Sequence, residues 1–134
     1  PGLEVNILNA MARVLLDEGL ARTERLSGVA ELQAALADYT PEAVAAATGV
    51  DAEAIKVAAR QLAAAENAAI LLAYGLPYEA ASRELGIAAA NLALLTGIAG
   101  RNGSGLYLCG EKSNSQGAID LGFEQGEFVI CVLE

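Results

Sequence analysis

The chain has 134 residues and a formal net charge of −9, from 17 acidic and 8 basic side chains. This length fits one ordinary domain with a hydrophobic core, and the negative charge disfavours nucleic acids and anionic membrane surfaces as partners. The sequence contains no run of about twenty apolar residues, so we expect no direct membrane insertion. Cys109 and Cys131 lack the spacing of a zinc or iron–sulfur motif, and there is no histidine. We therefore expect no metal site built from this chain alone.

The first third of the chain predicts helices. Apolar residues recur at helical spacing from Leu3 to Leu20, with Gly19 as the stop signal. A polar link and a shorter helix from about Val29 to Asp38 follow. Thr40 then has the chemistry of an N-cap, with Pro41 at the first helical position. This order predicts a new helix from Pro41 onward.

The middle of the chain predicts a further helix and a strand. Gly49 closes the preceding helix as a left-handed cap, and Asp51 begins a helix whose inner face carries Ile55 and Leu62. The continuous apolar run Ala68–Ala73 ends before a Gly and a Pro. We interpret this run as a buried strand, because parallel strands that are covered on both faces lose the alternating pattern.

The remaining elements complete an α/β pattern. Tyr78–Leu95 predicts a helix with a potential break at Gly86, and Phe128–Leu133 predicts a second buried strand. Helices that alternate with strands indicate a helix-rich, Rossmann-like layered domain with a small, mainly parallel sheet. Two or three strands make a small sheet, so we expect further strands from outside this chain or from a partner.

A glycine-rich stretch separates the long helix from the C-terminal part. It contains Gly97, Gly100, Gly103 and Gly105. Such a density of glycine is typical of positive φ angles or close backbone approach, and a phosphate cradle is one interpretation. However, the stretch follows a helix, so the negative end of the helix dipole faces it, and Arg101 is its only cation. We therefore expect a structural turn.

A polar cluster, Asn114–Gly122, contains the best candidate ligand contacts. Asn114, Gln116 and Asp120 concentrate amide and carboxylate groups in an irregular segment, and Gly117 allows close backbone approach. The alternative interpretation is that these side chains satisfy the backbone of their own loop. The chain offers no set of nucleophile, base and orienting group built around histidine, so we predict no catalytic residue.

Two blocks of sequence resemble the molybdopterin oxidoreductase superfamily. In the first, the helix ending Asn91–Gly97 leads into Gly100–Leu106 and then Asn114–Gly122; in the second, Tyr39–Val44 precedes Thr48–Val50. The superfamily includes formate dehydrogenases, nitrate reductases and the large iron–sulfur subunit of NADH:quinone oxidoreductase. Its chains are several times longer. The resemblance therefore implies that residues 1–134 are a single domain and a fragment of a larger fold.

The resemblance also implies a cofactor, although one segment departs from the pattern of the members that bind it. In cofactor-binding members the polar segment faces the cofactor, so Asn114, Gln116, Gly117 and Asp120 would contact molybdopterin guanine dinucleotide, if it is bound. An amide side chain offers both a donor and an acceptor to a pterin or guanine edge. Catalytic members usually carry a glycine pair and a polar stretch after the first strand, whereas Tyr74–Ala80 has one glycine and mainly apolar and ring residues.

This departure favours the large iron–sulfur subunit of bacterial NADH:quinone oxidoreductase (NADH dehydrogenase I), which is respiratory complex I. The resemblance then implies a structural domain without a redox centre or cofactor of its own, with iron–sulfur clusters elsewhere in the full chain. Its partners would be other subunits of an electron-transfer complex, and its location would be cytoplasmic, peripheral to the inner face of the membrane. The alternative is a cofactor-binding segment of an active molybdenum or tungsten oxidoreductase such as formate dehydrogenase.

Overall fold

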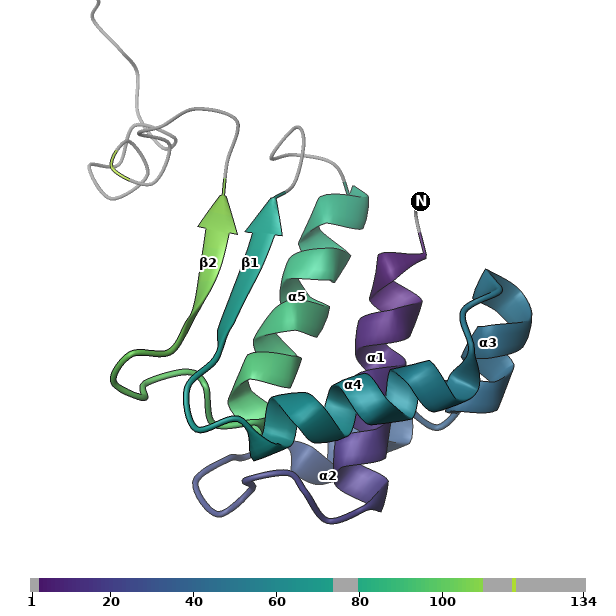
Figure 1. Cartoon of the computed structure of the whole chain (residues 1–134), viewed down its shortest axis with the longest axis horizontal. Coiled ribbons are helices and arrows are strands. Elements are labelled where there is room, and N and C mark those ends of the chain that lie inside the picture. The colour runs from purple at the N-terminus through teal and green to yellow at the C-terminus, as the bar shows by residue number, and fades with distance from the viewer. Residues whose placement is uncertain (1–2, 74–79, 110–116, 118–134) are drawn as a thin grey trace, which may run out of the picture.

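The computed structural model describes residues 3–73, 80–109 and 117 (Figure 1). The elements follow in the order α1 (Glu4–Asp17), α2 (Val29–Ala35), α3 (Pro41–Thr48), α4 (Ala52–Ala64), β1 (Ala69–Ala73), α5 (Ala80–Leu95) and β2 (Gly105–Cys109). The predicted class is confirmed, because the described residues form a helix-rich α/β fold with a small parallel sheet.

The starts of α3 and α4 follow the capping chemistry of the sequence. The Thr40 hydroxyl accepts a hydrogen bond from the Ala43 amide at 3.2 Å, and the Asp51 carboxylate accepts one from the Ala54 amide at 3.0 Å. Gly49 ends α3 with φ +76°, a left-handed conformation that glycine adopts without steric cost. All three predicted caps are therefore confirmed.

Helices α5 and α2 differ from their predictions, and α1 ends at Asp17, before the predicted end at Leu20. Helix α5 runs without a break through Gly86. Helix α2 ends at Ala35, three residues before the predicted end at Asp38. The chain turns there, with the Tyr39 amide donating to the Leu36 carbonyl at 3.0 Å, and the turn places Leu36 in the core at 3% exposure. The turn that buries Leu36 therefore lies where the last turn of the helix was predicted.

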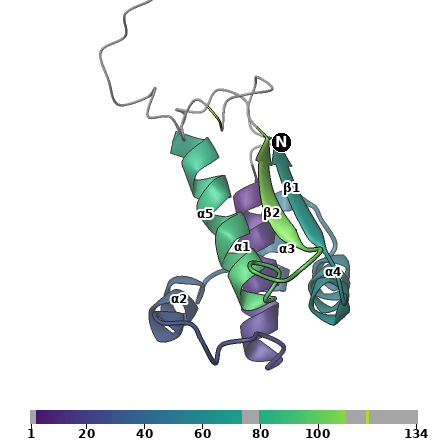
Figure 2. The same ribbon diagram turned by 90° about the vertical axis from the view of Figure 1, so that its left-hand side faces the viewer.

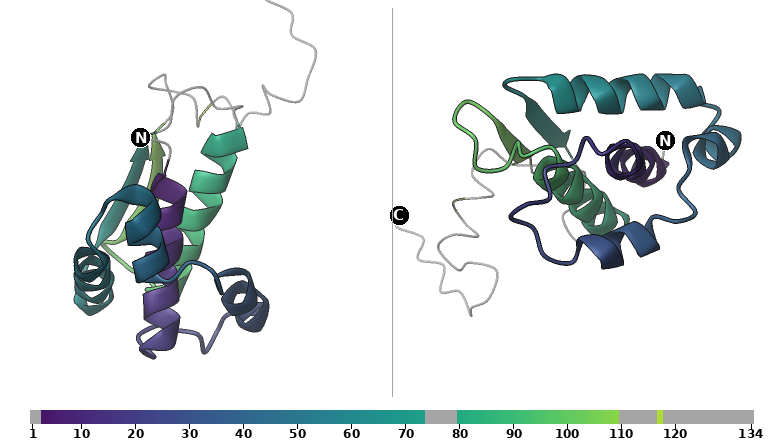
Figure 3. Two further views of the ribbon diagram at one scale, coloured as in Figure 1. Left: turned by 90° about the vertical axis from the view of Figure 1, so that its right-hand side faces the viewer. Right: turned by 90° about the horizontal axis from the view of Figure 1, so that it is seen from below.

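The core lies around α1, which packs against α3, α4 and α5 (Figure 3). Its largest fully buried apolar side chains come from α1, α4 and α5 and from the turn after α5. They are Leu15, Ile55, Leu92, Leu95 and Ile98. Small residues such as Ala12, Ala59 and Ala93 are also buried and let the helices approach closely. The helices are therefore held by interlocking aliphatic and alanine side chains.

The sheet consists of β1 and β2, which pair in parallel from Ala69 with Gly105 to Ala73 with Cys109. Helix α5 connects the two strands. Strand β2 is an element that the sequence pattern did not predict, because the residues there form only a short apolar run. The predicted strand Phe128–Leu133 lies outside the described residues.

The prediction that β1 is buried on both faces is wrong for the described residues. Helix α5 packs along the sheet, and Ile70 contributes to the core. Leu71, which points to the other face, is 70% exposed. The run of apolar residues therefore indicates a strand correctly, but the described elements cover it on one side.

Candidate functional site

The carboxyl ends of β1 and β2 meet at one edge of the sheet, because the strands are parallel and Ala73 pairs with Cys109. In open α/β sheets, ligands bind outside the carboxyl ends of the strands. Along the chain, β1 is followed directly by Tyr74–Ala80, and β2 is followed closely by Asn114–Gly122. These are the two segments whose sequences bear on cofactor binding. The candidate site is therefore this carboxyl edge.

Of the four predicted cofactor contacts, the structure describes Gly117, which is half-buried. Asn114, Gln116 and Asp120 lie outside the described residues, so their roles stay predictions. Within the residues that are described, no cluster of three or more His, Cys, Asp or Glu side chains is arranged to hold a metal ion. A metal carried by an organic cofactor would need no such cluster here.

The glycine-rich turn lies at the opposite edge, where both strands begin. Gly97, Gly100 and Gly103 have φ angles of +68°, +83° and +75°. At the end of the turn, the Gly105 amide donates to the Ala68 carbonyl at 3.2 Å, and the Ala68 amide donates to the Ser104 hydroxyl at 3.1 Å. The turn thus joins the start of β2 to the start of β1 and does not face the carboxyl edge.

Arg101 uses its guanidinium group on main-chain oxygens. Nη1 donates to the carbonyls of Ala65 and Glu66 at 3.1 and 2.7 Å, and Nη2 donates to the carbonyl of Thr96 at 3.0 Å. These carbonyls follow the C-terminal ends of α4 and α5, where helix dipoles favour a cation. The only cation of the glycine-rich stretch is therefore engaged by the main chain, and the prediction of a structural turn is supported.

Gly97 lies beside Arg22, which belongs to the link between α1 and α2. A Cβ atom at Gly97 would stand 2.8 Å from Cδ of Arg22, and the Arg22 amide donates to the Leu95 carbonyl at 2.7 Å. The glycine therefore serves both a positive φ and a close contact. No signal within the turn itself predicts this contact.

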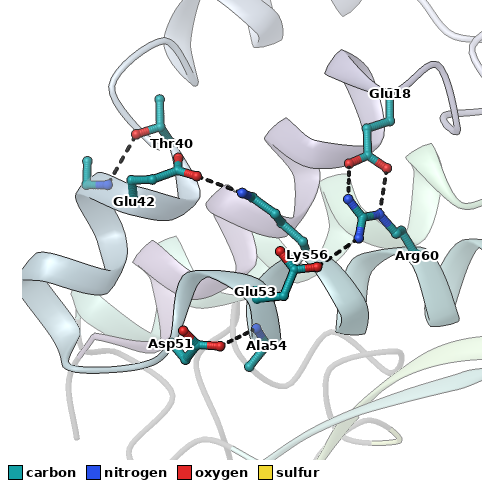
Figure 4. A network of polar contacts seen from close by, with 9 residues as sticks. Glu18, Thr40, Glu42, Asp51, Glu53, Ala54, Lys56 and Arg60 are labelled. Atoms are coloured by element: carbon teal, nitrogen blue, oxygen red, sulfur yellow. Dashed lines mark hydrogen bonds and ion pairs between the residues drawn. The ribbon is translucent and has the colours of Figure 1, made fainter.

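Charged side chains connect α1, α3 and α4 (Figure 4). Arg60 donates through Nε and Nη2 to the two carboxylate oxygens of Glu18 at 2.9 and 2.7 Å, and through Nη1 to Glu53 at 3.1 Å. Lys56 contacts Glu42 at 2.7 Å. These contacts link three helices at the surface.

The same contacts hold the groups in their charged forms. The hydrogen bond from Arg60 lowers the pKa of Glu18, and the hydrogen bond from Lys56 lowers the pKa of Glu42. Glu42 in turn raises the pKa of Lys56. Shifts in these directions fix charges at neutral pH, so the network is suited to structure rather than to proton transfer.

The helices of the described part of the chain do not have the character of membrane spans. Across residues 3–73 and 80–109, none of them combines the length and the hydropathy that crossing a bilayer requires.

Comparison with known proteins identifies the relatives of the chain. No protein-family model matches it. Formate dehydrogenase H of Escherichia coli is 36% identical over 125 residues, which are 90% of this chain and 18% of the relative. F420-dependent formate dehydrogenase 2 subunit alpha of Methanococcus maripaludis is 34% identical over 91% of this chain and 19% of its own length. NADPH-Fe(3+) oxidoreductase subunit alpha of Geobacter sulfurreducens is 32% identical over 96% of this chain and 16% of its own.

The chain thus spans about a fifth of the length of these relatives. The relatives are members of the molybdopterin oxidoreductase family, so the resemblance seen in the sequence is confirmed at that level. The finer assignment to the large subunit of NADH:quinone oxidoreductase is not supported by them, and they favour the alternative of a formate dehydrogenase-type enzyme. Similarity to these relatives over most of the chain therefore outweighs the departure of Tyr74–Ala80 from the pattern of catalytic members in choosing between the two assignments.

Proposed function

We propose that this chain is part of the cofactor-binding subunit of a molybdenum or tungsten oxidoreductase of the formate dehydrogenase type. The observation that carries the proposal is the 36% identity with formate dehydrogenase H over 90% of the chain. Because the chain spans 18% of that relative, the activity would belong to a longer polypeptide or to an assembly. Its proposed role is to support a cofactor.

The role of this segment would be to hold molybdopterin guanine dinucleotide at the carboxyl edge of the sheet. Asn114 and Gln116 carry amides that both donate and accept hydrogen bonds, and Asp120 accepts from N–H groups, so this donor set fits a pterin or guanine edge. Gly117 would let the backbone approach the cofactor. When bound, the cofactor supplies the redox-active metal, while these residues bind and orient it.

Other electron-transfer subunits are the proposed partners. Two of the relatives are named as alpha subunits, and this supports a multi-subunit setting. A cytoplasmic location at the inner face of the membrane was expected from the resemblance to complex I, and it is not part of this proposal.

The metal content of the native polypeptide that contains this segment tests the proposal. We expect about one molybdenum or tungsten atom per polypeptide, measured by plasma mass spectrometry on the purified protein. Asn114→Ala should lower the occupancy of that metal, whereas Asn102→Ala, in the structural turn, should leave it unchanged. Iron without molybdenum or tungsten would overturn the proposal in favour of a cofactor-free scaffold of the complex I type.

A further inference from the structure

The turn before β2 presents an asparagine that is followed by a glycine. The Ser104 amide donates to the Arg101 carbonyl at 3.1 Å, so Asn102 and Gly103 are the two central residues of a β-turn. Both are exposed, and the turn lies between the end of α5 and the start of β2 (Figure 2). Gly103 has φ +75°, as the second central residue of a type II turn does. The geometry of the turn therefore favours a glycine directly after Asn102.

An asparagine side chain can react with the main-chain amide of the residue that follows it. The amide nitrogen attacks Cγ, the bond from Cγ to Nδ2 breaks, and ammonia leaves with the proton of the attacking amide. Water then opens the resulting succinimide ring at either carbonyl. One opening gives aspartate, and the other gives isoaspartate, in which the main chain runs through Cγ. Because the attack is intramolecular, it depends on how freely the two groups can meet.

Both reacting groups are free at Asn102. Within residues 3–73 and 80–109, neither the Gly103 amide nor the side-chain amide of Asn102 has a hydrogen-bond partner. The attacking nitrogen belongs to a glycine, so no side chain hinders its approach to Cγ. The turn thus leaves the nucleophile and the carbon that it attacks next to each other and exposed to solvent.

The other asparagines of the described part of the chain are protected. Asn67 is exposed as well, but it is followed by an alanine, and the Ala68 amide donates to the Ser104 hydroxyl at 3.1 Å. The remaining asparagines lie in α1 and α5, where the amide that would attack is hydrogen-bonded within the helix. They are Asn6, Asn9 and Asn91. Asn102 therefore stands apart in both its neighbour and its free amide.

We propose that Asn102–Gly103 is a site of spontaneous modification, at which Asn102 deamidates through a succinimide to isoaspartate and aspartate. The reaction consumes only water, so the inference is independent of the proposed function and of any cofactor. Both products add a negative charge to the turn. Isoaspartate also adds one carbon atom to the main chain between Arg101 and Gly103.

The added main-chain atom affects the contacts that join the two strands. The turn places Ser104 and Gly105 against Ala68: the Ser104 hydroxyl accepts from the Ala68 amide, and the Gly105 amide donates to the Ala68 carbonyl. A longer main chain before Ser104 displaces these groups. Isoaspartate at this position therefore loosens the start of β2, whereas aspartate, which changes only an exposed side chain, leaves it in place.

Ageing in heavy-oxygen water tests the reaction. The native polypeptide that contains this segment is kept folded in neutral buffer made with heavy-oxygen water and then digested with trypsin in ordinary water. Heavy oxygen in an acid product marks deamidation that preceded digestion. Trypsin releases Asn67 and Asn102 in separate peptides, because Arg83 and Arg101 lie between them. Electron-transfer fragmentation distinguishes isoaspartate from aspartate.

We expect Asn102 to deamidate at least about tenfold faster than Asn67, because attack at Asn67 must break the hydrogen bond of the Ala68 amide. Asn102→Gln should abolish the signal from the turn and leave Asn67 unchanged, since a glutamine would have to close a larger ring. Equal rates at Asn102 and Asn67 in the folded polypeptide would overturn the inference, and so would a product at Asn102 without isoaspartate.

Hydrogen exchange tests the effect on the strand. After ageing, the fraction with isoaspartate should exchange the amides of Gly105–Cys109 about fivefold faster than the fresh polypeptide, as expected for the loss of one hydrogen bond. Asn102→Asp is the matched control for the charge alone and should exchange like the fresh polypeptide, and so should aged Asn102→Gln. Unchanged exchange in the isoaspartate fraction would refute the predicted loosening of β2.

Discussion

At the scale of single residues, Arg101 shows how a cation in a glycine-rich stretch can serve the fold. Its guanidinium donates to the carbonyls of Ala65, Glu66 and Thr96. The last carbonyls of a helix have no partner within the helix, and carbonyls just beyond the helix end need partners as well. Arg101 satisfies such groups from two helix ends at once, so the charge is engaged by the main chain and not presented to a ligand.

Replacing Arg101 should therefore cost stability. We expect Arg101→Met to lower the free energy of unfolding by about 2 to 3 kcal/mol, because three carbonyls lose a charged donor. Arg101→Lys should lower the free energy of unfolding by less than Arg101→Met does, since an ammonium group retains the charge without the planar fork. Urea denaturation of the full chain measures both. Arg83→Met, at an exposed arginine on α5, is the control, and an equal loss in both methionine variants would refute the assigned role.

The same residue marks a limit of what sequence can predict. The glycines of the turn predict its positive φ angles, because that requirement is local. The carbonyls that Arg101 binds in Ala65 and Glu66 lie 36 and 35 residues earlier in the chain, so no local pattern predicts them. The candidate cofactor contacts Asn114, Gln116 and Asp120 lie outside the described residues, so their predicted roles depend on the resemblance alone.

At the scale of elements, the ion pairs between helices make stability depend on pH. The pKa values of Glu18 and Glu42 are lowered from 4.5 by Arg60 and Lys56. Their contribution to stability is therefore present above about pH 4.5 and is lost as the pH falls through the lowered values. The pKa of Lys56 is raised from 10.5, so its contribution is complete below that pH and is lost as the pH rises through the raised value.

We therefore expect a modest fall in the urea midpoint between about pH 5 and pH 3, and a smaller fall in Glu18→Gln. The effect should shrink in high salt, because these side chains lie at the surface. Glu31→Gln, at an exposed glutamate of α2, is the control and should keep the pH dependence of the unsubstituted chain. A Glu18→Gln variant with an unchanged pH profile would show that the pair with Arg60 contributes nothing measurable.

Elements were predictable where their signals are local. The caps at Thr40 and Asp51 follow from a side chain and an amide three residues apart, so the starts of α3 and α4 are found from sequence. Strand β2 was missed because five apolar residues after a turn fit several structures, and pairing with β1 decides among them. The prediction that β1 is covered on both faces was wrong for the described residues, because Leu71 is 70% exposed. Burial of a strand depends on which other elements pack on the sheet.

At the scale of the whole molecule, stability depends on the contact between α1 and α5. Leu92 is 1% exposed and belongs to the same core cluster as Leu15 on α1. Leu92→Ala should lower the free energy of unfolding by about 3 kcal/mol through lost burial and an internal cavity. Leu94→Ala, two residues along the same helix and 45% exposed, should cost less than about 1 kcal/mol. Thermal unfolding of both variants checks this, and a reversed order would mean that α5 packs through its other side.

The position of Arg101 also has a consequence for the lifetime of the folded state. Its bonds to Ala65 and Glu66 close loops of 36 and 35 residues, so they require the ends of α4 and α5 to have come together. Interactions that form after the rate-limiting barrier scarcely change the rate of folding but slow the rate of unfolding. We therefore expect the contacts of Arg101 to form late in folding and to slow unfolding more than they speed folding.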